Sequence, residues 1–215
     1  MQIEGEIDED DTICIDSSFF VDRSYELTTF TFGSHVLQLF CLRSASTDYD
    51  LTGQLVWPGA VLLNNFLSLH AEILEGRSVI ELGSGVGITG ILCSRLCREV
   101  VLTDHNEEVL EARCSFCAFS IIKKNIELQS SLGNPGSTAS FQQSSVPPLF
   151  DTVEKLLRTQ GSKCRFILAY ISRAKNMDTV IVDEAVQRGM RIDEVDGART
   201  TVANLEGVIF EITLK

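Results

Sequence analysis

Two short apolar runs are each followed by residues suited to holding a ligand. Three glycines follow the first run and an aspartate follows the second: Val79–Leu82, then Gly83, Gly85 and Gly87; Val100–Thr103, then Asp104. Glycine lets a backbone turn tightly and approach a ligand closely. A carboxylate about twenty residues after the first glycine can accept both hydroxyls of a ribose. The pattern predicts a nucleotide-like ligand across the carboxyl ends of two parallel strands, with a simple tight connection as the alternative.

The glycine pattern also argues against some ligands. No Gly-Lys-Ser/Thr follows it, which disfavours a P-loop and nucleoside triphosphate hydrolysis. Residues 85–90 meet the spacing of a dinucleotide-binding turn, but that spacing alone has little specificity. No second set of residues suited to a nicotinamide ring accompanies it, so a dehydrogenase is a distant alternative.

Strands and helices are expected to alternate around these residues. The first half predicts a hairpin that turns at Gly33-Ser34, a helix that Pro58 opens, and then two strand–helix units. The expected ranges are 25–32, 35–42, 57–70, 79–82, 87–96, 100–103 and 106–119. Because the run at 79–82 is continuously apolar apart from Glu81, we expect it to be a buried parallel strand.

The second half predicts a helix, a strand, a helix and a closing antiparallel pair. The expected ranges are 147–158, 165–171, 178–188, 190–195 and 208–214. Gly189 is expected to stop the second of these helices. Residues 129–146 are rich in Ser, Gly and Pro and lack apolar alternation, which predicts a loop.

Three segments together resemble a known enzyme family. Residues 81–87, Glu-Leu-Gly-Ser-Gly-Val-Gly, resemble motif I of the seven-strand, class I methyltransferases that use S-adenosylmethionine (SAM). Residues 52–60 resemble the Gly-x-x-x-Trp segment of methyltransferase-like family 16, many of whose members methylate lysines on other proteins. Residues 101–106 resemble that family's second motif. The resemblance covers residues 25–128 well and 142–215 in outline.

This resemblance implies an α/β fold: a Rossmann-like class I methyltransferase sheet with helices on both faces and an N-terminal β-hairpin. It implies SAM as cofactor, bound by Trp57, Glu81, Gly83, Ser84, Gly85, Gly87, Asp104 and His105. Glu81 would face the ammonium group of SAM, and Asp104 would bind the ribose hydroxyls. Trp57 would form an aromatic wall, or be a plain core tryptophan. Asp104 and His105 have the alternative of a helix N-terminal charge and a helix cap.

The same resemblance places Tyr170 and Arg173 at the mouth of the substrate site, since they match a family Tyr-x-x-Arg pattern. An ordinary strand-end tyrosine and a surface arginine are equally open. SAM carries its own leaving group, so the protein mainly supplies placement and desolvation, and no catalytic residue or general base is named. A target lysine, with a free pKa of about 10.4, must lose its proton, and burial favours that loss.

The middle of the chain departs from the family pattern. The family's strand order is 3-2-1-4-5-7-6, and its third and fourth strands are not visible between residues 129 and 141. Without the fourth strand, two central strands would keep open edges or pair directly. Each unpaired buried backbone group would cost about 1–3 kcal/mol. The gap suggests a shortened chain. Its alternative function is that of a catalytically impaired isoform with partial SAM binding or a protein-interaction role.

Composition predicts a single domain at residues 25–215. The chain has 215 residues and seven cysteines, no apolar run of about 18 residues, and no signal-peptide pattern at its start. We therefore expect no membrane partner, and reduced thiols in the cytoplasm or also the nucleus. Cys93 and Cys97, and Cys114 and Cys117, lie within predicted helices, which favours buried free thiols over a zinc site. No metal is expected.

Charge indicates which partners to expect. The net charge is −12, and residues 1–24 are expected to be a flexible acidic arm that either attracts a basic protein partner or is simply solvated. The absence of a basic stripe disfavours nucleic acid, whose phosphates supply most of its affinity. The sequence therefore predicts a SAM-dependent methyltransferase acting on a lysine of a protein, and leaves the oligomeric state open.

Overall fold

The computed structural model describes residues 25–43, 51–104, 121–132, 138–139, 146–161, 163–172 and 175–215. The strands are β1 Glu26–Phe32, β2 His35–Cys41, β3 Ser78–Leu82, β4 Glu99–Thr103, β5 Thr138–Ala139, β6 Phe166–Ile171, β7 Met190–Glu194, β8 Thr200–Val202 and β9 Leu205–Leu214. The helices are α1 Pro58–Leu69, α2 Ile88–Cys93, α4 Ile121–Ser131, α5 Val146–Gln160 and α6 Lys175–Gln187, with short 3-10 helices at Leu51–Gln54 and Ala71–Ile73. The expected mixed α/β architecture is confirmed.

Local signals in the sequence explain several of these elements. Gly33 takes a φ of +55° at the hairpin turn, and β1 pairs antiparallel with β2 in full register. Pro58 opens α1, where its missing N–H does no harm. Gly189 takes a φ of +70° two residues after the last residue of α6, as expected of a residue that stops a helix. These three predictions are confirmed, whereas β8 was not predicted.

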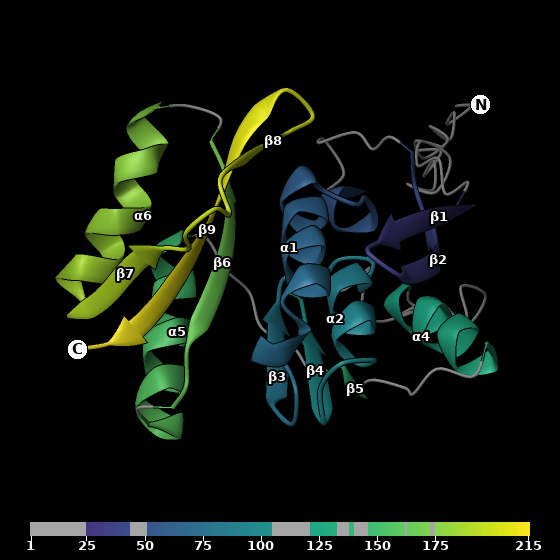
Figure 1. The fold of residues 1–215 in the computed structure, drawn as a ribbon, viewed down its shortest axis with the longest axis horizontal. Helices are drawn as coiled ribbons and strands as arrows, with labels where there is room; N and C mark the ends of the chain where they lie inside the picture. Colours follow the sequence, from purple (N-terminus) through teal and green to yellow (C-terminus); the bar gives the residue numbers. More distant parts are fainter. Residues whose placement is uncertain are drawn as a thin grey trace, which may run out of the picture.

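The strands of the described part form three sheets (Figure 1). One is the β1–β2 hairpin, one has the order β3-β4-β5, and one has the order β6-β9-β7 with β8 also on β9. Read from β5 to β3, the second sheet has the order 3-2-1 that the resemblance implies. The third sheet has the implied order 5-7-6 when β6, β7 and β9 are counted as the fifth, sixth and seventh strands. Among the described strands, none occupies the position between β3 and β6. Each of these two strands thus has a ladder partner on one edge alone, β4 for β3 and β9 for β6.

This interruption changes the burial of β3. Ile80 is 45% exposed although it lies in a strand next to the glycine-rich turn. The prediction of a buried strand is therefore wrong here, while its parallel pairing with β4 is confirmed. The physical reason is that no described strand lies on the second edge of β3. The hydrophobic sequence of β3 suits a central strand, but the strand lies at an edge.

The predicted loop at 129–146 also needs correction. Helix α4 continues to Ser131, and β5 pairs in parallel with β4 through Thr138 and Ala139. A short strand therefore lies in the interval that was expected to hold none. The helix was missed because its buried face contains the polar residues Asn125 and Gln129. The helix predicted at 106–119 and the arm at 1–24 lie outside the described residues.

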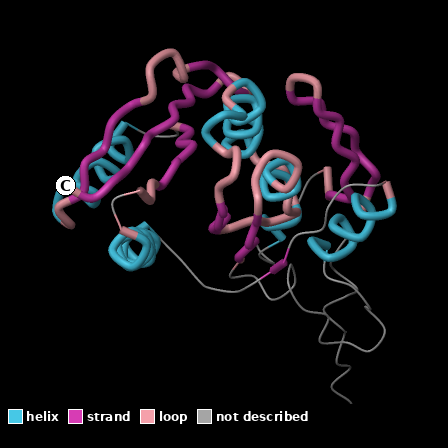
Figure 2. The backbone as a smooth tube through the Cα atoms, turned by 60° about the horizontal axis from the view of Figure 1, so that its bottom comes forward, coloured by secondary structure: helices cyan, strands magenta, loops and turns pink. Residues whose placement is uncertain are grey.

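Two hydrophobic cores form, one on either side of the interruption. Figure 2 shows the backbone of the two groups of elements that build them. The N-terminal core is built from the hairpin, α1, α2, α4 and the β3–β4 pair, with Leu37, Leu92 and Leu102 fully buried. The C-terminal core is built from α5, α6 and the β6-β9-β7 sheet, with Phe150 and Ile212 fully buried. Helix α1 packs against both α2 and β6 and so joins the two halves.

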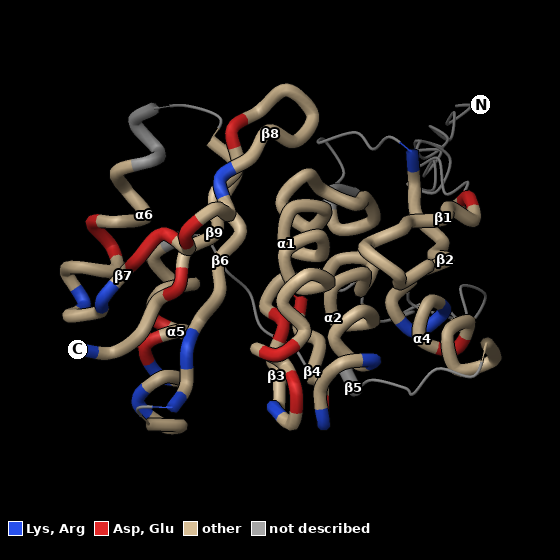
Figure 3. Tube along the Cα trace, in the orientation of Figure 1, with Lys and Arg blue, Asp and Glu red and all other residues tan. Residues whose placement is uncertain are grey.

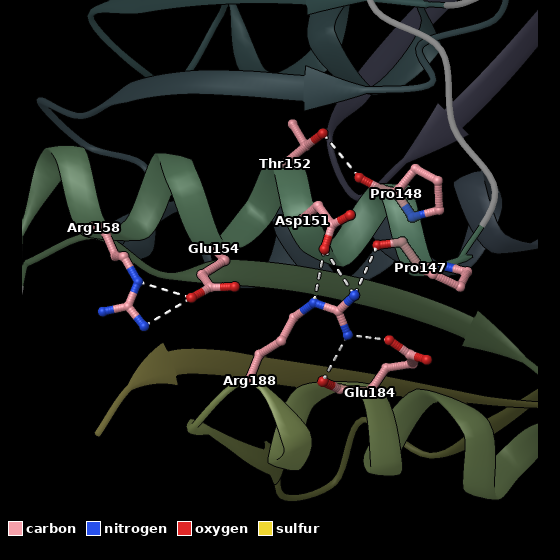
Figure 4. A network of polar contacts seen from close by, with 8 residues as sticks. All are labelled: Pro147, Pro148, Asp151, Thr152, Glu154, Arg158, Glu184 and Arg188. Atoms are coloured by element: carbon pink, nitrogen blue, oxygen red, sulfur yellow. Dashed lines mark hydrogen bonds and ion pairs between the residues drawn. The ribbon is translucent and has the colours of Figure 1, made fainter.

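An arginine forms ion pairs with both α5 and α6 and so connects the two helices (Figure 4). Arg188 follows α6, and its guanidinium donates to Asp151 Oδ1 of α5 at 2.8 and 3.1 Å. It also pairs with Glu184 of α6 and donates to the Pro147 carbonyl at 3.4 Å. Its side chain is only 18% exposed, so this contact lies partly out of solvent. Arg158 and Glu154 form a separate, more exposed pair along α5.

Candidate functional site

The glycine-rich turn joins β3 to α2 and has a backbone that requires glycine. Gly83, Gly85 and Gly87 have φ values of +72°, +52° and +85°. At Gly85 space is limiting as well, because an added Cβ would lie 2.7 Å from the carbonyl oxygen of Gly53. At Gly83 an added Cβ would meet nothing within 4 Å. The turn thus packs closely against Gly53, before α1, at Gly85, whereas the space beside Gly83 is free of other protein atoms.

Asp104 at the end of β4 reaches this turn, as the sequence predicts. One carboxylate oxygen, Oδ2, accepts the N–H of Gly85 at 2.7 Å, and the residue is 3% exposed. Ser84 extends the β3–β4 ladder: its N–H donates to the Thr103 carbonyl at 2.8 Å, and its hydroxyl accepts the Thr103 N–H at 3.0 Å. The predicted ligand residues at 83–85 and 104 therefore form one connected unit. Their contacts with a ligand remain predictions.

Glu81 lies at the same edge, but its carboxylate points to the first turn of α2. Its Oε2 accepts the Gly90 N–H at 2.8 Å. The pKa of Glu81 is raised to about 7, chiefly because the carboxylate is buried and to a smaller extent because of the charge of Asp104. Hydrogen bonds from Gly90, Thr89 and Ser84 act in the opposite direction. A carboxyl group that titrates near neutral pH beside a glycine-rich turn is typical of a functional site.

Trp57 immediately precedes α1 and is half-buried. Its neighbours Val56 and Ala60 pack against the N-terminal core, but within the described residues Trp57 belongs to neither core cluster. An aromatic wall for the ligand and a plain core tryptophan therefore both stay predictions for Trp57. The start of α1 also meets the end of β6, since an added Cβ on Gly59 would lie 3.6 Å from the Ala169 carbonyl oxygen.

Tyr170 lies at this end of β6 and lines a small cavity of about 80 Å³. The other lining residues come from the end of β6 and the β8–β9 hairpin: Ser172, Arg199, Glu206, Gly207, Val208 and Phe210. Gly53, in the 3-10 helix before α1, thus adjoins the glycine-rich turn, and Gly59 at the start of α1 adjoins the end of β6. His105 and Arg173 lie outside the described residues.

Some buried polar residues around the turn were not predicted from the sequence. Gln54 is almost fully buried and accepts a hydrogen bond from the Tyr25 hydroxyl. Asn64 of α1 donates to the Thr89 hydroxyl at 2.8 Å, next to Glu81. Asn125 of α4 donates to the Val86 carbonyl at 2.9 Å. The signal in the sequence was a polar residue on the otherwise apolar face of a helix, Asn64 in α1 and Asn125 in α4. Hydropathy alone does not distinguish such a position from one that faces solvent.

Over the described ranges, no group of three or more His, Cys, Asp or Glu side chains could hold a metal ion. Cys93 and Cys97 have free thiols, and burial raises the pKa of both. Cys114 and Cys117 lie outside the described residues. No helix of the described part is long and apolar enough to cross a membrane.

Comparison with known proteins confirms the resemblance over the part of the chain that holds this turn. Residues 42–135 match the sequence profile of a family described as lysine methyltransferase. The mouse protein N-lysine methyltransferase METTL21A is 32% identical over 103 residues, which cover 47% of this chain and 40% of the relative. The human histone-arginine methyltransferase METTL23 is 42% identical over 52 residues, covering 24% of this chain and 27% of the relative.

A third relative has a lysine-directed name. The protein-lysine N-methyltransferase EFM3 of Chaetomium thermophilum is 34% identical over 71 residues, covering 32% of this chain and 21% of the relative. The chain thus spans two fifths or less of the length of these relatives. All three are methyltransferases by name. The family profile at residues 42–135 covers the glycine-rich turn and Asp104.

Proposed function

We propose that this chain is a SAM-dependent N-methyltransferase that acts on a protein substrate, with lysine as the favoured acceptor. The observation that carries the proposal is the bond between Asp104 Oδ2 and the Gly85 N–H at 2.7 Å, which joins the two predicted SAM-binding motifs in space. The family profile over residues 42–135 supports it. The lysine-directed names of two relatives favour lysine over arginine.

The residues at this edge fit the chemistry of SAM. The backbone above Gly83 is open, so a ligand can approach the turn closely. SAM has a cationic sulfonium and an ammonium group, and Glu81 and Asp104 place two carboxyl groups at the same sheet edge. When bound, SAM supplies an activated methyl group. Asp104 would hold the ribose hydroxyls, Glu81 and the turn at 83–87 the amino-acid part, and Trp57 would cover the cofactor, with His105 nearby.

The acceptor side is proposed to lie where α1 adjoins the end of β6. Tyr170, with Arg173 after it, would border the opening through which a lysine side chain enters. A half-buried aromatic edge lowers the pKa of an entering ammonium by desolvation, which yields the neutral amine that the reaction needs. The chain's part in the reaction is to place and desolvate the two reactants.

A basic protein is the proposed partner. The net charge of −12 favours such a partner. Over α6, β7 and β9 Figure 3 shows acidic residues beside basic ones, and Arg188, Arg191 and Arg199 pair with neighbouring carboxylates there, so the support comes from the overall charge. Cys41, Cys93, Cys97 and Cys164 are free thiols, which supports the proposal of a reducing compartment such as the cytoplasm or nucleus.

Calorimetric titration of the purified chain with S-adenosylhomocysteine tests the cofactor half of the proposal. We expect saturable binding that Asp104→Ala weakens by about tenfold or more, as for loss of a hydrogen bond to a charged group. Gln129→Ala is a matched control on α4, away from the turn. A folded chain that does not bind would contradict the proposal and favour the impaired-isoform hypothesis. Methyl transfer to lysine-bearing and arginine-bearing peptides then tests the acceptor.

A further inference from the structure

Asn125 of α4 is fully buried, and its side-chain amide makes three hydrogen bonds. Its Oδ1 accepts the Phe40 N–H at 2.7 Å. Its Nδ2 donates to the Phe40 carbonyl at 3.0 Å and to the Val86 carbonyl at 2.9 Å. Both amide hydrogens and the oxygen are therefore used, and they bind two segments that lie far apart in the sequence.

The two bonds to Phe40 make the amide act like a neighbouring strand. They satisfy both backbone groups of one β2 residue on the edge that faces away from β1. One helical turn later, Gln129 repeats part of this pattern, because its Nε2 donates to the Gln38 carbonyl at 2.7 Å. Helix α4 therefore covers the outer edge of the hairpin through side-chain amides, which protects that edge from other strands.

The third bond distinguishes Asn125 from Gln129. Val86 lies inside the glycine-rich turn, next to Gly85, whose N–H is bound by Asp104. The turn is thus held from β4 by Asp104 and from α4 by Asn125. Helix α4 also packs directly on it, because a Cβ added to Gly87 would lie 3.0 Å from Ile122 Cγ1. The Val86 carbonyl fixes the peptide plane that leads into α2.

We propose that Asn125 is a positioning residue that holds the glycine-rich turn in its ligand-binding conformation and couples that conformation to the β1–β2 hairpin. The proposal rests on the proposed function, since the ligand it concerns is SAM. Asn125 does not touch the reacting atoms in this role. It acts through its hydrogen bond to the Val86 carbonyl. A displacement of the hairpin would shift the Asn125 amide and, through this bond, the glycine-rich turn.

The matched pair Asn125→Ala and Gln129→Ala tests this. Both variants remove a side-chain amide that covers the β2 edge, but only the first reaches the turn. With all chains shown to be folded by circular dichroism, we expect S-adenosylhomocysteine to bind Asn125→Ala about tenfold more weakly and Gln129→Ala within about twofold of the parent. Equal weakening in both variants would overturn the proposal.

Amide hydrogen exchange without ligand provides an independent readout. We expect exchange at residues 84–88 to be about tenfold faster in Asn125→Ala and unchanged in Gln129→Ala, because only the first frees the Val86 carbonyl. Unchanged exchange in Asn125→Ala would also overturn the proposal. If that variant does not fold, the near-isosteric Asn125→Leu serves instead, since it fills the same buried space but cannot donate to the Val86 carbonyl. If exchange at residues 84–88 is faster in Asn125→Ala but the parent chain does not bind S-adenosylhomocysteine, the proposed function is refuted and the positioning role is kept.

Discussion

Gly85 and Asp104 are joined by a hydrogen bond of 2.7 Å, from the N–H of the first to Oδ2 of the second. The two residues come from neighbouring parallel strands, at the point where each strand ends. The bond means that Asp104 already has a structural role before any ligand binds. Substitutions at this position therefore act on stability as well as on affinity, and the two effects have to be measured separately.

Asp104→Asn separates the two roles of this carboxylate. The amide oxygen can still accept from Gly85, so we expect this variant to lose less than about 1 kcal/mol of unfolding free energy. Asp104→Ala removes the acceptor and is expected to lose about 1.5–3 kcal/mol. Urea unfolding measures both values. Equal losses in the two variants would show that the negative charge, and not the bond to Gly85, stabilises the turn.

The titration of Glu81 predicts a specific pH dependence. Its pKa is about 7 in the folded chain, above the ordinary value of 4.5, because burial disfavours the carboxylate. The folded chain therefore binds more protons between these values, and stability from this group is lost as the pH rises through 7. Between pH 5.5 and pH 8 the loss is expected to be about 2 kcal/mol.

Glu81→Gln provides the control for this effect, since it cannot titrate but keeps an oxygen for the Gly90 N–H. We expect its unfolding free energy in urea to vary less between the two pH values than that of the parent, by about 2 kcal/mol. Identical pH profiles would mean that the carboxylate is solvated in the folded chain.

Gly83→Ala and Gly85→Ala compare strain with steric overlap. Both positions have a left-handed backbone, which costs an alanine about 1–2 kcal/mol. An alanine at 85 would also press its Cβ against the Gly53 carbonyl oxygen, whereas one at 83 would meet open space. We expect Gly85→Ala to lose about 4 kcal/mol or more in chemical denaturation. Similar losses at both positions would contradict the close approach of Gly53.

Arg188→Met and Arg158→Met compare a partly buried ion pair with an exposed one. Arg188 ties α5 to α6 through Asp151, and its loss is expected to lower the unfolding free energy by about 1–2 kcal/mol. Arg158 pairs with Glu154 within α5, and its loss should change stability by less than about 0.5 kcal/mol. Thermal unfolding followed by circular dichroism measures both. A larger effect at 158 would contradict the proposed fastening of the two helices.

Much of this arrangement could be predicted where the signals are local. The left-handed glycines, the Pro58 helix start and the alternation of strands and helices each depend on a few neighbouring residues, and the structure confirms them. The closeness of Asp104 to the turn followed from parallel strands ending at one sheet edge. Residues outside the described ranges, such as His105 and Arg173, stay predictions.

What could not be predicted depends on distant partners. Helix α4 buries Asn125 and Gln129, which are polar in any sequence window and become core residues only because β2 offers an unpaired edge. The direction of the Glu81 carboxylate depends on the packing of α2 over β3. The exposure of Ile80 depends on which strand lies beside β3 in space, and the composition of β3 itself suits the buried alternative.

The interruption between β3 and β6 also affects the cooperativity of thermal unfolding. Each half has its own core, and no hydrogen-bond ladder in the described part connects the two sheets. Helix α1 packs against both halves, and Leu82 at the end of β3 packs against the C-terminal core, so side-chain packing transmits stability between them. Such a build favours two calorimetric transitions in place of one cooperative transition. A ligand bound at the glycine-rich turn would raise the temperature of the N-terminal transition more than that of the C-terminal transition, since binding directly stabilises the unit that binds.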